Sequence, residues 1–157
     1  MHPKRGDLYF FEVPQEYRGK HEDYGPHMHV VVSREEINND GKIVAVVPLT
    51  SPIGKDGKPK DVGLWRFSRI RIPSNQKIWE SDSPHTQQGD SLAKTEQIFC
   101  VTQDVLGTRC GKLPPDALGS LEPGMAFVLD IPTMSSAAKA LGNPGKAIRP
   151  PIKPSSQ

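Results

Sequence analysis

Short apolar segments, separated by Gly, Pro and polar clusters, run along the first third of the chain. Residues 6–13, 29–33 and 42–50 are rich in aromatic and β-branched side chains, and each segment predicts a strand. The continuous apolar run within 29–33 is typical of a strand that is buried on both faces. Residues 38–41, with the sequence NNDG, indicate a turn between the second and third strands.

The second half of the chain gives weaker patterns. Residues 64–72 alternate and predict a strand, and residues 91–102 predict two short strands. Leucines and other apolar residues at helical spacing predict a helix from about residue 115, interrupted or kinked at Pro123 and Gly124. Polar segments rich in Gly and Pro predict loops at 14–27, 52–63 and 81–90.

The composition favours many turns over long helices. The 157 residues include 16 Pro and 14 Gly, which break helices and central strands. Several short strands and one C-terminal helix predict a mainly β (α+β) fold, a small and partly closed barrel. No apolar stretch approaches the roughly 18 residues of a membrane span, and the N-terminus lacks the apolar run of a signal peptide. Two cysteines form no disulfide framework, so we expect a cytoplasmic protein.

Charge and composition divide the chain into two parts. We expect a folded domain over residues 1–133 and a disordered basic tail over residues 134–157, where Gly, Pro and small residues offer little to pack. Four of the 20 bases and none of the 18 acids lie in the tail, so residues 1–133 carry about −2. Within the domain, residues 52–77 hold seven bases and two acids, and this local +5 can attract an anionic ligand.

Four segments, in order, resemble the MazF/PemK family of toxin ribonucleases. They are KRGDLY at 4–9, GPHMHVVVS at 25–33, IVAVVPLTS at 43–51, and LAKTEQ at 92–97 followed by CGKL at 110–113. The resemblance covers about residues 4–130. The family's catalytic Arg falls on His27, its following Pro falls on Met28, and its Asp falls on Glu96.

The resemblance implies an SH3-like, PemK-like barrel with a C-terminal helix, in agreement with the pattern of strands. It also implies a sequence-specific endoribonuclease toxin that cuts single-stranded RNA without a metal or another cofactor. The expected partners are the RNA, a cognate antitoxin and a second copy of the chain in a homodimer.

Five residues are the catalytic candidates. Cleavage through the 2′-hydroxyl needs a base, an acid for the leaving oxygen and a cation or donors for the phosphate. His27 is the candidate acid or base, because an imidazole titrates near neutral pH. Glu96 is its candidate partner or the base, Lys94 the fixed cation on the same face of a strand, and Thr50 and Ser51 the hydroxyl donors.

The candidate RNA-binding residues combine cations with aromatic rings. Trp65 shares one side of the predicted strand at 64–72 with two arginines, and aromatic rings beside cations can stack single-stranded bases. The full set is Arg5, His29, Lys55, Lys58, Trp65, Arg69 and Arg71.

Two other interpretations stay open at this stage. His27 and His29, together with His21 or His85, can bind a transition metal, although no firm ligand spacing is present. The change from Arg to His at residue 27 also fits a PemK-like module that binds RNA or protein and has lost cleavage. Each candidate has a plain structural reading too: a loop histidine, a strand end, an exposed ion pair, or core aromatic residues.

Overall fold

The computed structural model describes residues 2–15, 25–74 and 89–131. Most of the loop expected at 14–27, nearly all of the loop expected at 81–90 and the tail expected at 134–157 lie outside the described residues.

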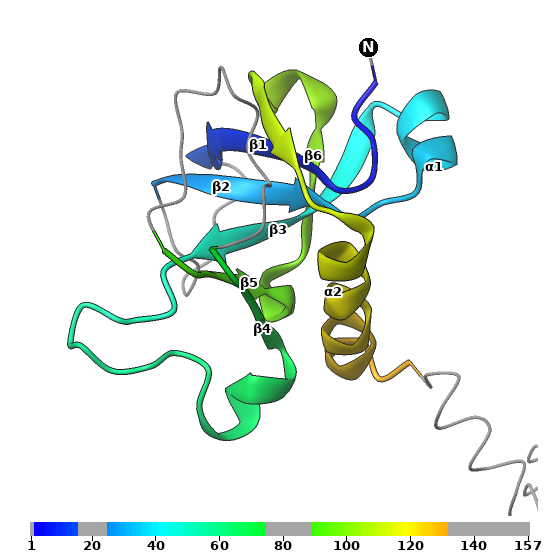
Figure 1. The fold of residues 1–157 in the computed structure, drawn as a ribbon. Coiled ribbons are helices and arrows are strands. Elements are labelled where there is room, and N and C mark those ends of the chain that lie inside the picture. The colour runs from blue at the N-terminus through cyan, green and yellow to red at the C-terminus, as the bar shows by residue number, and fades with distance from the viewer. Residues whose placement is uncertain (1, 16–24, 75–88, 132–157) are drawn as a thin grey trace, which may run out of the picture.

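In the described part of the chain, seven strands form one antiparallel sheet in the order β4-β5-β3-β2-β1-β7, with β6 paired to β3 (Figure 1). The strands are β1 (Asp7–Glu12), β2 (Pro26–Val31), β3 (Ile43–Thr50), β4 (Arg69–Ile72), β5 (Ser91–Lys94), β6 (Phe99–Thr102) and β7 (Arg109–Lys112). The strands predicted from the three apolar runs are confirmed as β1, β2 and β3.

Strand β3 is the centre of the sheet and gives it its curl. One edge of β3 pairs with β2. The other edge pairs first with β6, where Val46 faces Phe99, and then with β5, where Thr50 faces Leu92. Because two strands share one edge of β3, the sheet bends into a half-barrel, as the mainly β prediction expected.

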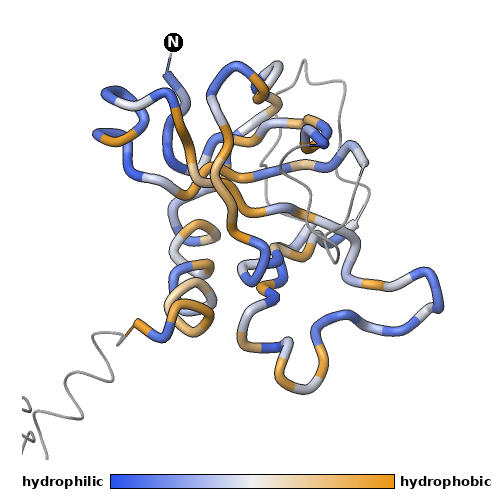
Figure 2. Tube along the Cα trace, turned by 180° about the vertical axis from the view of Figure 1, so that it is seen from behind, coloured by the Kyte–Doolittle hydropathy of each residue, from blue (hydrophilic) through white to orange (hydrophobic). Residues whose placement is uncertain are grey.

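Apolar side chains lie on both faces of the central strands, which explains their unbroken apolar runs. Figure 2 shows that hydrophobic residues dominate these central strands. One cluster lies under the C-terminal helix α2 (Pro115–Val128) and includes Leu8, Val30, Val47, Ala93 and Leu121. The second cluster lies on the opposite face and includes Tyr9, Phe11, Val31, Val46, Val101 and Leu106. Within the described residues, no helix is long and apolar enough to cross a membrane.

Helix α2 corrects the prediction of an interrupted helix. It begins at Pro115, a residue suited to the first helical position, and continues through Pro123 to Val128. Gly124, which follows Pro123 within the helix, is buried against the sheet. A Cβ at Gly124 would lie 2.9 Å from Thr95 Oγ1 and 3.1 Å from Ile70 Cγ1, so glycine lets the helix pack closely.

Several short elements also differ from the sequence predictions. The turn expected at 38–41 is the end of a helix, α1 (Glu35–Asp40). The strand expected at 64–72 begins as a 3₁₀ helix, η2 (Gly63–Phe67), and only then becomes β4. The two strands expected in 91–102 are β5 and β6, separated by the 3₁₀ helix η3 (Thr95–Gln97). A further 3₁₀ helix, η4 (Gln103–Val105), and strand β7 were not predicted.

Candidate active site

Thr50 ends β3, and the loop after it folds back toward the same position. The N–H of Lys60 donates to the carbonyl of Pro52 at 2.9 Å. Gly57 has φ of +76° in the loop, a conformation that glycine adopts without steric cost. The Lys60 ammonium therefore lies 3.1 Å from Thr50 Oγ1, although the two residues are ten positions apart.

Arg69 holds this loop in place from strand β4. Its Nε donates to Glu96 Oε1 at 2.7 Å, and its Nη1 donates to the carbonyl of Lys60 at 2.7 Å. Its guanidinium carbon lies 4.2 Å from the centre of the Trp65 ring, a cation–π contact. The side chains of Arg69 and Glu96 are only 16% and 15% exposed, so water screens this ion pair weakly.

The 3₁₀ helix η3 positions Glu96. The N–H and the hydroxyl of Thr95 both donate to the carbonyl of Ser68, at 2.9 and 2.6 Å, which fixes η3 against the start of β4. Glu96 then faces Arg69, while its other oxygen, Oε2, is buried and accepts no hydrogen bond in the described part of the chain. Since η3 interrupts the strand, the prediction that Lys94 and Glu96 share a strand face is wrong.

Arg71 lies further along β4 and is exposed. Its Nη2 donates to Asp61 Oδ2 at 2.9 Å, and its Nη1 lies 3.6 Å from Asp90 Oδ2. The hydrogen bond from Arg71 lowers the pKa of the Asp61 carboxyl group. Asp61 and Asp90 therefore offset part of the positive charge that Arg71 brings to this surface.

His27 lies at the start of β2, half-buried. Met28 faces Leu49 across the β2–β3 pair, and continuing this register by one residue sets His27 beside Thr50. Side chains directly opposite on neighbouring strands lie about 5 Å apart at Cβ. The sheet thus brings together two pairs of candidate residues: His27 with Thr50, by this continued register, and Arg69 with Lys94 across β4 and β5. No hydrogen bond joins His27 to Glu96 among the described residues, because Glu96 is engaged by Arg69.

His29 corrects the predicted RNA-binding set. Its side chain is buried, with 1% of the residue exposed. The ring stacks on Phe11 at 4.1 Å and meets Phe99 edge-on at 5.6 Å. Its Nδ1 lies 2.9 Å from the carbonyl of His27, where it can donate a hydrogen bond. His29 is therefore a core residue, and its ring offers no surface to RNA.

We expect His29 to make the fold sensitive to mild acid. Burial lowers the pKa of His29 to about 4, whereas an unfolded chain has an imidazole pKa of about 6.5. The free energy of unfolding therefore keeps its full value above pH 6.5, where the imidazole is neutral in both states. It falls by about 3 kcal/mol in total as the pH falls toward 4, because the unfolded chain binds a proton that the folded chain does not. Chemical unfolding of the protein and of His29→Phe between pH 7 and 5 tests this. Between pH 7 and 5 the unmodified protein should lose about 2 kcal/mol of unfolding free energy through His29, and His29→Phe should not show this loss.

Residues 4–129 match the family described as PemK-like, MazF-like toxin of type II toxin–antitoxin system. The chain belongs to this family. A comparison with the curated proteins gives no match.

Solved structures support the family's fold at low sequence identity. The chain is similar to an endoribonuclease in complex with its cognate antitoxin from Mycobacterial species, with 19% identity, TM-score 0.55 and coverage of 83% of this chain and 98% of that chain. It is similar to MazF (Form-I) from Deinococcus radiodurans, with 14% identity, TM-score 0.57 and coverage of 83% and 98%. The Mycobacterium tuberculosis toxin MazF-mt6 gives 12% identity, TM-score 0.55 and coverage of 80% and 97%.

The remaining candidate residues fall in different environments. Lys94 ends β5 opposite Arg69 and is only 6% exposed, so the plain alternative of an exposed ion pair with Glu96 does not hold for it. Ser51 accepts a hydrogen bond from the N–H of Ile53 at 3.3 Å, as a turn-forming serine does. Arg5 pairs with Glu122 of α2 at 2.9 Å, apart from the Thr50 loop.

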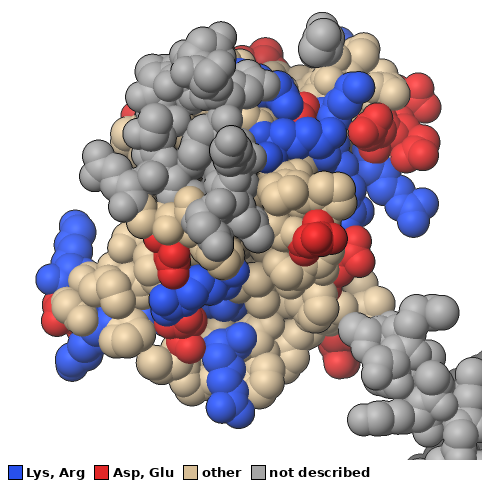
Figure 3. Space-filling view, in the orientation of Figure 1, with Lys and Arg blue, Asp and Glu red and all other residues tan. Residues whose placement is uncertain are grey.

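Exposed aromatic and basic residues surround the Thr50 loop. Trp65 and Phe67 are 49% and 43% exposed, so neither is a core residue, and Lys55 and Lys58 are exposed in the loop. The prediction that Trp65 shares a strand face with Arg69 and Arg71 is wrong, because Trp65 belongs to η2. Figure 3 shows Lys and Arg side chains gathered in separate areas of one face of the molecule, with acidic side chains among them.

Lys60 is the residue that the candidate list missed. Lys60 belongs to the basic segment at 52–77, but its contact with Thr50 forms only because the loop folds back on strand β3. The sequence does carry one signal for that return: Gly57 lies between Pro52 and Lys60, within a run of turn-forming residues.

Proposed function

We propose that this chain is a sequence-specific endoribonuclease toxin that cuts single-stranded RNA in the cytoplasm. It acts as a homodimer without a metal cofactor, and a cognate antitoxin restrains it. The observation that carries the proposal is the contact between the Lys60 ammonium and the Thr50 hydroxyl, held by the Arg69–Glu96 pair. Membership of the toxin family supports it, as does the similarity in fold to an endoribonuclease bound to its antitoxin.

The proposed reaction uses the RNA's own 2′-hydroxyl. His27 removes the 2′ proton, and the 2′-oxygen attacks the phosphorus. The bond between the phosphorus and the 5′-oxygen breaks, and the 5′-oxygen takes up a proton as it leaves. The Lys60 ammonium and the Thr50 hydroxyl stabilise the charge that develops on the non-bridging oxygens. The product is a 2′,3′-cyclic phosphate and a free 5′-hydroxyl.

The other members of the site position these groups. Glu96 holds Arg69, and Arg69 holds the carbonyl of Lys60, so the ammonium stays beside Thr50. Lys94 lies opposite Arg69 and supports the end of β5. Ser51 fixes the first turn of the loop. A fixed cation that is already in place need not reorganise during the reaction, which favours cleavage.

The exposed rings and cations around the loop form the proposed RNA-binding surface. Trp65 and Phe67 are about half exposed, with the Arg69 guanidinium over the Trp65 ring and the Arg66 guanidinium over the Phe67 ring, and unpaired bases can stack on the aromatic surface that stays open. Arg71 contributes charge that Asp61 partly offsets. Lys55 and Lys58 extend the basic surface along the loop, where they can contact backbone phosphates.

Cleavage itself can be tested with the purified protein and a long single-stranded RNA. We expect discrete fragments with cyclic phosphate and 5′-hydroxyl ends, in equal yield with and without EDTA. Loss of cleavage in EDTA would instead support the metal interpretation. RNA binding at low salt without any cleavage would support a binding module. Among the described residues no three His, Cys, Asp or Glu side chains form a metal-binding group, and His21 and His85 lie outside those residues.

The loop lysines should control the salt dependence of RNA binding. Replacing Lys55 and Lys58 by Ala removes two exposed phosphate contacts. The slope of log K against log salt is negative, and its magnitude should decrease by about 1.4. Binding titrations between 50 and 200 mM salt measure this slope. Replacing Lys42, which is exposed outside the proposed surface, should leave it unchanged. An equal effect at Lys42 would place the RNA elsewhere.

A further inference from the structure

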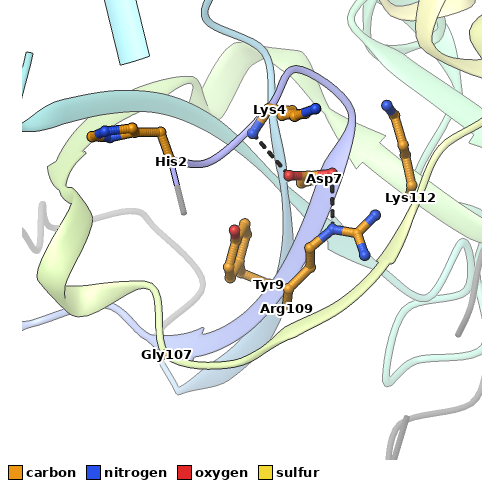
Figure 4. A pocket seen from close by; sticks show the side chains of 7 residues that line it. All are labelled: His2, Lys4, Asp7, Tyr9, Gly107, Arg109 and Lys112. Atoms are coloured by element: carbon orange, nitrogen blue, oxygen red, sulfur yellow. Dashed lines mark hydrogen bonds and ion pairs between the residues drawn. The ribbon is translucent and has the colours of Figure 1, made fainter. Parts of the chain in front are cut away.

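A second basic site lies beside β1 and β7. The N-terminal segment and these two strands frame a cavity of about 400 Å³ (Figure 4). Six of its lining residues carry polar side chains: His2, Lys4, Asp7, Tyr9, Arg109 and Lys112. None of the lining residues belongs to the Thr50 loop, and β2 and β1 lie between β3 and β7 in the sheet order, so this cavity is separate from that loop.

Asp7 organises the walls of the cavity. It is the one acidic residue among the described lining residues, and it is 3% exposed. The N–H of Lys4 donates to its Oδ2 at 2.8 Å, and Arg109 Nε lies 2.9 Å from its Oδ1. Both carboxylate oxygens are therefore engaged, and Asp7 fixes the position of the arginine. Three permanent cations, Lys4, Arg109 and Lys112, leave an excess of positive charge around one carboxylate.

The register of β1 and β7 makes these side chains converge. Asp7 faces Lys112, and Tyr9 faces Arg109 after a bulge between Leu8 and Tyr9. Paired residues point to the same side of a sheet, so the cations project into one space, as Figure 4 shows. Burial, with the nearby charge of Asp7, raises the pKa of the Tyr9 phenol. Its hydroxyl stays protonated at neutral pH and can donate a hydrogen bond.

We propose that this cavity binds the phosphate group of a nucleotide, either free or within an RNA backbone. Arginine binds phosphate through its planar fork, and lysine acts as a point charge. The tyrosine hydroxyl adds a neutral donor at the cavity wall. A volume of about 400 Å³ falls within the range of small-molecule sites, so the cavity has room for more than inorganic phosphate. The site is independent of RNA cleavage at Thr50.

The test is a set of binding titrations with the full chain, followed by the amide NMR signals of β1 and β7. The probes are inorganic phosphate, a nucleoside 5′-monophosphate and a short single-stranded oligonucleotide with 2′-O-methyl sugars, which cannot be cleaved. Lys112→Gln should weaken binding of the phosphate probe about tenfold, because it removes one charged donor. Lys4→Gln provides a second variant, in the N-terminal segment that lines the cavity. Lys42→Gln removes the same charge outside the lining and should bind like the unmodified protein.

The probes distinguish the two sources of phosphate. Binding of the free nucleotide supports a nucleotide site. Binding of the oligonucleotide alone, weakened by Lys112→Gln, supports a backbone phosphate site. The proposal is overturned if no probe shifts the signals of β1 and β7, or if Lys112→Gln and Lys4→Gln, with unchanged melting temperatures, bind as tightly as Lys42→Gln. Because the readout is binding, an absence of cleavage would leave this result interpretable.

Discussion

His27→Ala is expected to slow RNA cleavage by ~10²–10⁴, the usual contribution of a general acid or base. The reason is that the β2–β3 register, continued by one residue beyond the Met28–Leu49 pair, sets His27 beside Thr50, whose hydroxyl lies next to the Lys60 ammonium. An imidazole at this position can accept the 2′ proton while lysine and threonine hold the phosphate. Single-turnover cleavage measures the effect, which should appear in kcat rather than in KM.

Two companion variants separate chemistry from structure. Added imidazole should partly restore cleavage in His27→Ala, because it supplies the missing base, whereas a structural defect would not respond. His27→Arg carries the residue that the family resemblance places here. It should retain cleavage well above His27→Ala, since a guanidinium can stabilise the phosphate. A His27→Ala rate within a few-fold of the unmodified protein would sink the histidine mechanism.

The central strands could be predicted because their sequence is locally consistent. Residues 43–50 are apolar almost throughout, and the structure buries both faces of β3 between two clusters. The helix start at Pro115 was predictable for a similar reason, since proline suits a first helical turn. In these segments the local pattern and the tertiary environment favour the same conformation.

The 3₁₀ helices could not be predicted, because tertiary contacts determine them. The alternation in 64–72 resembles that of a strand, yet only Arg69–Ile72 pairs with β5. Thr95 turns the chain out of β5 by bonding twice to the carbonyl of Ser68, which lies 27 residues away. A local sequence pattern cannot predict a hydrogen-bond partner that is 27 residues away.

The same limit applies to the candidate site. The sequence offered both His27 and His29 as candidates, but it could not show that the rings of Phe11 and Phe99 pack on His29 and make it a core residue. The resemblance pointed to Thr50 and Glu96, and neither residue carries a signal for its neighbour. Lys60 reaches Thr50 only after the loop has folded back, and Arg69 reaches Glu96 only after β4 has paired with β5.

Lys60→Met is expected to lower kcat for RNA cleavage by ~10²–10³, the cost of removing one preorganised donor to a developing oxyanion. Methionine keeps much of the side-chain length and removes the charge beside Thr50. The matched comparison is Lys58→Met, which removes the same charge from an exposed position two residues earlier. Lys58→Met should weaken RNA affinity and raise KM, with kcat nearly unchanged.

Thr50→Val completes the test, because valine has nearly the same shape and lacks the hydroxyl. If the ammonium and the hydroxyl stabilise the same phosphate oxygens as a unit, the double variant should lose little more than the Lys60→Met variant alone. Losses that multiply would mean that the two groups act on separate steps or separate oxygens.

If Lys60→Met instead behaves like Lys58→Met, with a raised KM and an intact kcat, Lys60 only holds RNA. The cation for the reaction would then have to come from Arg69, whose guanidinium is already bound to Glu96 and to the carbonyl of Lys60. Such an arginine would have to exchange one of these partners for the phosphate, so Glu96→Gln, which weakens its hold on Arg69, should then speed cleavage rather than slow it.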